Sequence, residues 1–438
     1  MATTRVENFE GFKDRHGPLT WGQRHYWTIL AGHPMNRRQF SLRQHWRIPA
    51  GANLELVCSA VRTLVERHEA LRTHIFFHGD GEPIQRVRGC GSFQITVRDV
   101  GHEATEADAE EAAGDMAAQD FRLNEEFPIR FQVLLADGEP VFLAVVVSHL
   151  AVDGYACGVL EGEFMEVVRG DKDLAPPSKQ PLDWAEKERS SAGASVNRRS
   201  LTYFDELLRA HPVSLFPRDN AMENVGREGF PVVLGHGVGL GAKISELSGR
   251  WKSPVSAVAL ASLVRSLAHH SATDVFPLGL TSSNRFLPGA DGYVGMLAQN
   301  TALGVRTAGK STRELAGEIR RSQMAAYQSA AYDQGDLDAL LEVAHPGADR
   351  VGFGAVSHFV NFQHGYVFPP RPDGIAPELP PYFLWHGDRV PYEIPRFGII
   401  ISSDDHDLGV RIFADPAALP VSKVESIIKT FFDEFIGH

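Results

Sequence analysis

The sequence predicts an α+β protein built of two lobes. Its 438 residues exceed a single ordinary core, since one domain takes about 150 residues. Helix and strand patterns follow each other irregularly in both halves of the chain. Between the halves, residues 171–200 are polar and rich in Pro, Lys and Ser, a composition typical of an inter-domain connection. We expect an N-terminal lobe over 1–175, a linker over 176–200 and a C-terminal lobe over 201–438.

In the N-terminal half, the first clear pattern is a helix followed by a strand. Apolar residues recur at helical spacing over 54–71, and "RTHIFF" then changes to strand character. The Ala- and Glu-rich stretch 103–121 predicts another helix. The runs "IRFQVLLA" and "PVFLAVVVSH", joined by the turn "DGEP", predict an antiparallel hairpin, and helical spacing returns after Gly154.

The C-terminal half repeats this mixture without a visible internal repeat. Helical spacing predicts helices over 195–211, 242–270 (as a pair), 312–328, 336–344 and 421–436. Apolar and β-branched runs predict strands within 229–240, 274–285, 355–363, 397–405 and 408–415.

Charge and cysteine content exclude several classes of function. The formal net charge is -12 and no basic block occurs, which argues against nucleic acid and an anionic membrane surface as partners. Three cysteines without CxxC spacing form no disulfide framework or zinc ribbon and indicate reduced thiols. No apolar run reaches the roughly 18 residues of a membrane-spanning helix, and the N-terminus lacks the apolar core of a signal peptide. We expect a cytoplasmic protein.

Some segments superficially resemble cofactor or metal motifs, but a structural role explains each of them better. The stretch "GHGVGLGAK", residues 235–243, has the spacing of a dinucleotide fingerprint but lacks the acidic residue about 20 positions later. The segments "RHEALRTH" and "GHEATE" each lack the second His of the H-E-x-x-H motif, and "DDHD" at 404–407 suits a hairpin turn. We expect no metal site.

The stretch "VFLAVVVSHLAVDG", residues 141–154, is the strongest candidate for chemistry. Ser148 has no G-x-S-x-G elbow, and strand alternation would point Ser148 and His149 to opposite faces, so the two cannot form a nucleophile and base pair. His149 stands where a rigid strand gives way to a loop, a position that suits a general base. From these residues alone, a hydrogen-bonded core histidine is the favoured interpretation.

The chain resembles the condensation domains of nonribosomal peptide synthetases, which share the chloramphenicol-acetyltransferase-like fold. "SHLAVDG" is similar to the HHxxxDG signature of that family. Further matches follow in the family's order: "PLTWGQRHYW" (18–27), "RHEALRTHIF" (67–76), "FRLNEEFPIRFQVLL" (121–135), "PLDWAEKE" (181–188), "SSNRFLPGADGYVGMLAQNTALGVR" (282–306) and "VSHFVNFQ" (356–363).

The resemblance implies two acetyltransferase-like lobes in a V-shaped pseudo-dimer with the active site in an interlobe tunnel. It assigns catalysis to His149, and a structural ion pair to Asp153 and Arg285, because a buried carboxylate needs a charged partner. Gly154 would supply backbone freedom or leave room for a thioester arm. Gln299 and Asn300, in a motif near the active site, are candidate tunnel residues, with a hydrogen-bonded loop as the alternative.

The implied reaction is attack of an amine or hydroxyl on a carrier-protein-bound acyl thioester, with His149 as base or positioning group. The phosphopantetheine arm comes from an acyl or peptidyl carrier protein, or from coenzyme A, so no cofactor of the chain's own is expected. Alternatives are an acyl-CoA-dependent acyltransferase, and a modified member that docks carrier proteins or rearranges a tethered chain. The acyl donor, the acceptor and the choice between amide and ester stay open.

Ser148 replaces the first His of the signature and marks a specialised member. The chain ends near the family's last helix, so we expect a free-standing enzyme of secondary metabolism. An acidic carrier needs a basic docking patch, for which Arg37 and Arg38, or Arg198 and Arg199, are candidates, solvated surface charge being the alternative.

Overall fold

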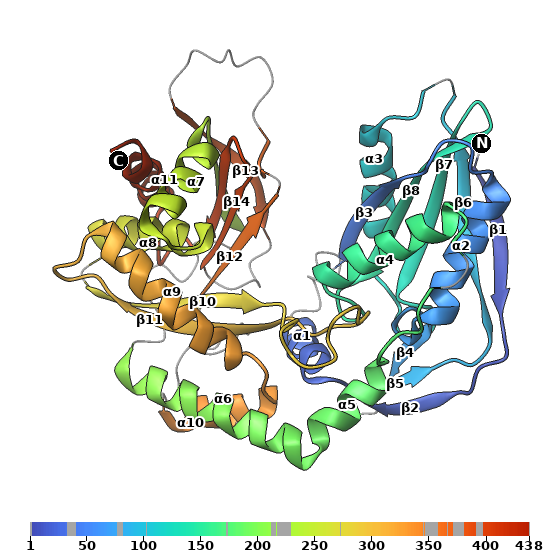
Figure 1. The fold of residues 1–438 in the computed structure, drawn as a ribbon, viewed down its shortest axis with the longest axis horizontal. Helices are drawn as coiled ribbons and strands as arrows, with labels where there is room; N and C mark the ends of the chain where they lie inside the picture. The colour runs from blue at the N-terminus through green and yellow to red at the C-terminus, as the bar shows by residue number, and fades with distance from the viewer. Residues whose placement is uncertain are drawn as a thin grey trace. The chain divides into compact units, whose positions relative to one another are not determined.

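The computed structural model divides the chain into two compact units. Unit 1 comprises Met1–Ser195 with Ser283–Ala298, and unit 2 comprises Val196–Ser282 with Gln299–His438 (Figure 1). The structure describes residues 2–32, 41–76, 82–101, 103–171, 174–211, 216, 229–271, 273–344, 346, 358–365, 367–370, 381–390 and 397–437.

Unit 1 holds eight strands among its described residues: β1 (Ala2–Phe9), β2 (Arg15–Pro18), β3 (Ser41–Arg47), β4 (Thr73–Phe76), β5 (Ile84–Val87), β6 (Gly91–Asp99), β7 (Ile129–Ala136) and β8 (Glu139–Ser148). Its helical elements are α1 (Trp21–Gly32), α2 (Leu54–Arg67), the 3-10 helix η2 (Glu69–Arg72), α3 (Glu106–Ala117), α4 (Gly154–Val168) and α5 (Pro181–Arg189), and α6 (Ser191–Ala210) begins at its end.

The main sheet of unit 1 has the strand order β1-β6-β7-β8-β3 and is covered on both faces; β2, β5 and β4 form a separate small sheet. Alternate residues of β8 point to opposite faces. Leu143, Val145 and Val147 join the core beneath α2 and α4. Phe142 and Val146 pack with the alanines of α3. Burial on both faces explains why β8 is an unbroken apolar run rather than an alternating one.

Unit 2 is built on a seven-stranded sheet of order β11-β10-β12-β14-β15-β9-β13. The strands are β9 (Phe230–Gly237), β10 (Val275–Ser282), β11 (Gln299–Arg306), β12 (His358–His364), β13 (Tyr382–Val390), β14 (Phe397–Ser403) and β15 (Leu408–Ala414). The helices are most of α6, then α7 (Leu240–Trp251), α8 (Val255–His269), α9 (Thr312–Gln328), α10 (Gln334–Ala344) and α11 (Val421–Ile436).

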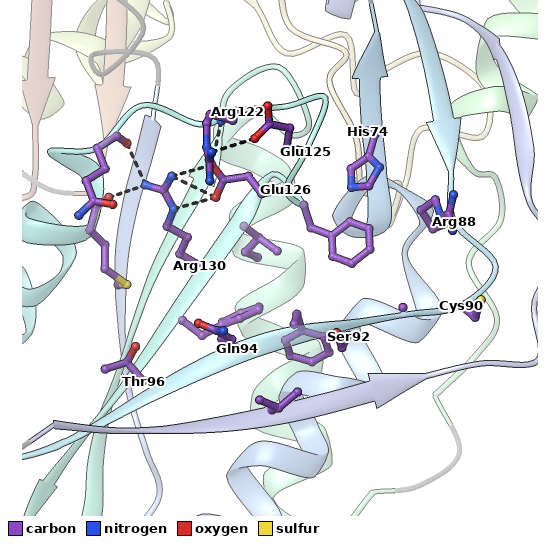
Figure 2. A pocket seen from close by; sticks show the side chains of 18 of the residues that line it. His74, Arg88, Cys90, Ser92, Gln94, Thr96, Arg122, Glu125, Glu126 and Arg130 are labelled. Atoms are coloured by element: carbon purple, nitrogen blue, oxygen red, sulfur yellow. Dashed lines mark hydrogen bonds and ion pairs between the residues drawn. The ribbon is translucent and has the colours of Figure 1, made fainter.

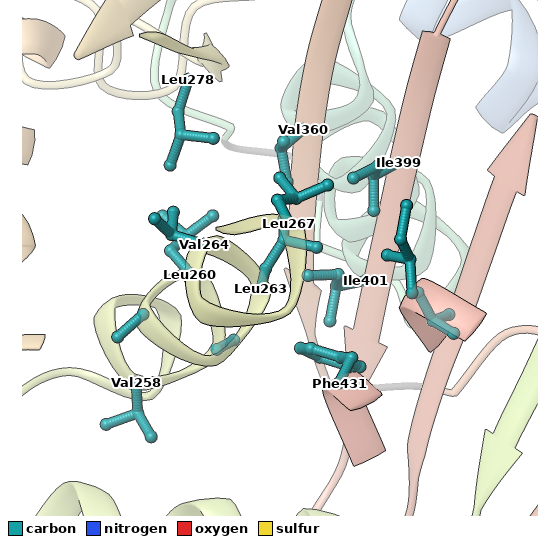
Figure 3. Packing of buried hydrophobic residues seen from close by; sticks show 14 of the residues in the cluster. Val258, Leu260, Leu263, Val264, Leu267, Leu278, Val360, Ile399, Ile401 and Phe431 are labelled. Carbon is teal, nitrogen blue, oxygen red and sulfur yellow. The ribbon is translucent and has the colours of Figure 1, made fainter. Parts of the chain in front are cut away.

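The core of unit 2 lies between this sheet and helices α7, α8, α9 and α11. Figure 3 shows Val360, Ile399 and Ile401 pointing from β12 and β14 toward α8. Side chains alternate along a strand, so Ile400, which lies between Ile399 and Ile401, belongs to the other face of the sheet.

Most elements expected from periodicity are present. The hairpin of β7 and β8 is antiparallel and turns at Asp137 and Gly138, both with positive φ. Helix α9 spans 312–328 as predicted, and "DDHD" joins β14 to β15. The patterns did not reveal α1, α5, the strands β11 and β13 of unit 2, or five strands of unit 1, namely β1, β2, β3, β5 and β6. Part of the strand predicted over 355–363 lies outside the described residues.

The expected lobe boundaries differ from the units in two places. The proposed linker over 176–200 is largely helical, because Pro181 occupies the first turn of α5 and Gln180 and Asp183 form a capping box there. The hairpin loop between β10 and β11, residues 283–298, belongs to unit 1 although both strands belong to unit 2. Its Tyr293 packs against Trp184 of α5.

Among the described residues, no helix combines the length and apolarity needed to cross a bilayer. The same residues contain no group of three or more His, Cys, Asp or Glu arranged to hold a metal ion. The glycine-rich stretch 235–243 forms the end of β9 and the start of α7, where a Cβ on Gly241 would meet the carbonyl oxygens of Asp404 and Asp407 at 2.5 and 2.4 Å. Close packing of the backbone thus explains that glycine.

Candidate functional site

The candidate site begins where β8 ends. Ser148 is the last residue of the strand, and residues 149–151 form a turn that leads to α4. The Ser148 hydroxyl accepts a long hydrogen bond from the Leu150 amide, 3.4 Å, whereas the His149 ring bonds to the Val152 carbonyl. Their polar groups therefore engage different partners, and the described structure contains no hydrogen bond between Ser148 and His149.

The contacts of His149 determine which ring nitrogen is available. Nδ1 lies 3.0 Å from the Val152 carbonyl oxygen. Because a carbonyl oxygen only accepts, Nδ1 carries the proton in this bond, and the neutral ring presents the lone pair of Nε2. Burial lowers the pKa of His149 below its ordinary value, and the nearby Asp153 carboxylate opposes that shift only in part. The ring is thus suited to accept a proton at Nε2 near neutral pH.

Tyr26 of α1 packs against this imidazole. The two ring centroids are 4.4 Å apart with planes inclined by 32°. Tyr26 is buried in a cluster with Leu19, Leu30 and Leu150, and burial raises the pKa of its phenol far above the ordinary value, so the phenol stays neutral. Sequence reasoning missed this residue; the only signal was its place in the motif "PLTWGQRHYW".

Asp153 is the structural anchor of the site and is 1% exposed. It is the N-cap of α4, where Oδ1 accepts the Ala156 amide at 3.0 Å and also a hydrogen bond from Arg285. Its Oδ2 accepts the amides of Leu297 and Ala298 at 3.0 and 3.2 Å. One carboxylate therefore fixes both the start of α4 and the end of the 283–298 loop.

Arg285 completes this anchor from within the loop. Besides its ion pair with Asp153, it donates to the carbonyls of Tyr293, at 2.8 Å, and Gly295, at 3.3 Å. Its guanidinium also lies 4.6 Å from the ring centroid of Tyr155. The preceding residue, Asn284, adopts a positive φ of 56° and donates to the Leu297 carbonyl, which closes the loop. The pair of Asp153 and Arg285 anticipated from the resemblance is present.

Gly154 was expected either to supply backbone freedom or to leave room for a thioester arm. Its φ is not in the left-handed region, and a Cβ built on it would meet nothing within 4 Å. Neither backbone strain nor crowding by the chain requires glycine here. Room for a ligand beside Gly154 stays a prediction.

Gln299 and Asn300 lie at the start of β11 and are buried in unit 2. The Gln299 side chain donates to the Tyr332 carbonyl at 2.9 Å, and Asn300 Oδ1 accepts from the Thr281 hydroxyl at 3.0 Å. Gln299 is thus bonded like an ordinary buried polar residue, whereas the buried Nδ2 of Asn300 has no hydrogen-bond partner among the described residues. Contact of either residue with substrate stays a prediction.

The candidate docking arginines differ in what the structure describes. Arg198 and Arg199 are exposed on α6. Arg37 and Arg38 lie outside the described residues.

A separate cavity of about 980 Å³ lies in unit 1, between β6, β7 and α3, and contains none of the predicted site residues (Figure 2). Its charges largely pair with each other: Arg130 binds Glu126 and three backbone carbonyls, and Arg122 pairs with Glu125. His74 stacks on Phe127 at its rim. These four charged groups therefore balance one another within the cavity.

The sequence matches the family described as "Condensation domain" over residues 13–366. Among curated proteins, it is 26% identical over 347 residues to the probable non-canonical nonribosomal peptide synthetase CymA of Salinispora arenicola, an alignment covering 75% of this chain and 4% of that protein. It is 25% identical over 326 residues to surfactin synthase subunit 2 of Bacillus subtilis, covering 70% and 9%. The chain thus spans a small part of these relatives.

Solved structures of low sequence identity share the fold. A condensation domain that mediates chain release from the enacyloxin polyketide synthase superposes with a TM-score of 0.73 at 19% identity, covering 96% of this chain and 82% of the other. SgcC5 from Streptomyces globisporus gives a TM-score of 0.72 at 17% identity, covering 96% and 98%. The X-domain from teicoplanin biosynthesis gives 0.68 at 17%, covering 95% and 94%.

Proposed function

Because the chain belongs to the condensation-domain family, we propose that it joins a carrier-bound acyl group to an amine or hydroxyl in natural-product biosynthesis. The observation that carries the proposal is His149, held as the Nδ1–H tautomer with Nε2 left to accept a proton. Asp153 and Arg285 support it by fixing the turn that presents the imidazole.

In the proposed reaction, the acceptor nitrogen or oxygen attacks the thioester carbonyl, the new C–N or C–O bond forms and the C–S bond breaks. The acceptor's proton passes to Nε2 of His149 and then to the departing thiolate of the pantetheine arm. The lowered pKa of His149 keeps the ring neutral, so that it accepts the proton of a hydroxyl or orients a neutral amine. The arm would be supplied by a carrier protein.

Reconstitution of the full chain with an acyl carrier-protein thioester and a panel of amines and alcohols tests this proposal. His149→Ala should lower turnover by about 10²–10⁴-fold, the usual contribution of a positioned acid or base. His269→Ala is the matched control, because His269 is an exposed histidine at the end of α8. Equal turnover by wild type and His149→Ala contradicts the proposed role.

The donor arm of the same experiment separates the alternatives. If acyl-CoA serves as well as the carrier thioester, the chain is an acyl-CoA-dependent acyltransferase of the same superfamily. If the carrier binds tightly and no donor is turned over, a docking or rearranging role takes the place of condensation.

A further inference from the structure

An arginine that has no ion pair or hydrogen bond among the described residues lies within the seven-stranded sheet of unit 2. Arg411 is the fourth residue of β15, and the strand order places β14 on one side of it and β9 on the other. The cross-strand registers define a row of side chains, named here the Arg411 row: Asn361, Ile400, Arg411, Leu234 and Trp385. All five are partly exposed, whereas most residues of these strands are buried.

The row belongs to the face of the sheet opposite the helices. Val410 and Ile412, the neighbours of Arg411 in sequence, are in the core with α8 and α11. Figure 3 shows Ile399 and Ile401 on that same helical side. Strand alternation therefore places Arg411 and its partner Ile400 on the other face.

In the part of the chain that the structure describes, no acidic group pairs with Arg411. Its flanking row members are Leu234 and Ile400, and its neighbours two residues away on β15 are Gly409 and Phe413. Among the described residues it forms neither an ion pair nor a hydrogen bond, and burial lowers the pKa of its guanidinium. The carboxylate of Asp407, which directly precedes β15, is engaged by His236 and the Gly239 amide.

A half-buried arginine without a counterion is costly for folding, since burial removes hydration that an ion pair would replace. A chain gains from keeping such a charge where a ligand supplies the anion. The planar guanidinium presents parallel N–H donors that match the two oxygens of a carboxylate. Leu234, Ile400 and Trp385 offer an apolar surface to the body of the same ligand.

We propose that Arg411 binds the carboxylate of a small-molecule ligand whose apolar body lies along the Arg411 row.

Binding is tested on the full chain without any donor or turnover, so that its outcome is independent of the condensation reaction. The probe is cyclohexanecarboxylate, followed through the ¹³C-methyl resonances of Ile400 and Leu234. We expect saturable shifts with the carboxylate and none with the neutral cyclohexanecarboxamide or with inorganic phosphate. Arg411→Met should weaken binding by about tenfold or more, and Arg411→Lys by less, because lysine keeps the charge and loses the fork.

The control is Arg306→Met, which removes an exposed arginine of β11 paired with Asp274 and should leave carboxylate binding unchanged. Thermal unfolding adds a second readout: Arg411→Met should be at least as stable as wild type, because it removes an uncompensated charge. Equal carboxylate binding by wild type and Arg411→Met, equal binding of the carboxamide, or a clear loss of stability in Arg411→Met overturns the proposal. Equal binding of phosphate also overturns it, because the site would then not select a carboxylate.

Discussion

The substitution Asp153→Asn tests the central anchor of unit 1. In the native chain, Oδ1 accepts from Ala156 and Arg285, and Oδ2 accepts from Leu297 and Ala298. The amide of asparagine has one oxygen that accepts and an NH₂ group that does not, so either orientation leaves two donors without an acceptor. The change also leaves the Arg285 guanidinium, 8% exposed, without its counterion.

Breaking one side of a buried ion pair costs about 3–5 kcal/mol, and this range already includes much of the cost of the lost hydrogen bonds. We expect the free energy of unfolding to fall by that amount. Hydrogen exchange gives a local measurement, since the Leu297 and Ala298 amides should lose about a hundredfold or more of their protection.

Two further variants make the reasoning refutable. Arg285→Met in the Asp153→Asn background should recover part of the lost stability, because the buried charge is then absent. Asp205→Asn is the matched control: its pair with Arg209 on α6 is exposed, and its removal should cost less than about 1 kcal/mol. A loss below about 1 kcal/mol for Asp153→Asn itself would show that the anchor contributes little.

Three other predictions follow from the same geometry. The acid limb of kcat/KM should have its midpoint below pH 6.5, since burial lowers the pKa of His149. Tyr26→Leu should raise this midpoint by admitting water to the imidazole, and Tyr26→Phe should restore it; a midpoint that Tyr26→Leu leaves unchanged refutes the packing role of Tyr26. Gly154→Ala should lower turnover while the fold stays as stable or becomes up to about 1 kcal/mol more stable. Gly162→Ala, at an equally open position on α4, should affect stability alone, and equal turnover by the two variants contradicts the need for space at Gly154. Glu163 has a folded pKa of about 2, because hydrogen bonds from His68 and Arg67 outweigh the opposing effect of burial. About 3 kcal/mol of stability present above pH 4.5 should therefore be lost as the pH falls toward 2, and Glu163→Gln should abolish that dependence in acid titrations of unfolding.

Local patterns predicted the elements that carry the site. The apolar run of β8 and the helical spacing after Gly154 depend only on neighbouring residues, and both are present. The order of motifs along the chain added Asp153 and Arg285, which lie 132 positions apart. No periodicity contains that contact, so it could come only from resemblance to a family.

Other features depend on contacts that sequence patterns do not contain. Strand β1 has an exposed pattern without a clear apolar face, and its pairing with β6 appears only in the fold. Tyr26 has the same local pattern as any apolar residue of α1. Arg411 looks like ordinary surface charge within "LGVRIFA", and its lack of an acidic neighbour becomes visible only from the registers of the adjoining strands. Helix α5 and the first turn of α6 were hidden by polar composition, which resembles that of a linker.

The return of residues 283–298 to unit 1 sets an order on biosynthesis. When the ribosome has made α4, Asp153 has no Arg285 to pair with, and the loop that supplies it is completed only after all of β10 has been added. At about 5–20 residues per second, translation needs roughly 10 seconds to add the 132 intervening positions. During that interval the Asp153 carboxylate lacks Arg285 and the amides of Leu297 and Ala298, so unit 1 completes its hydrogen bonds only after the 283–298 loop has been made.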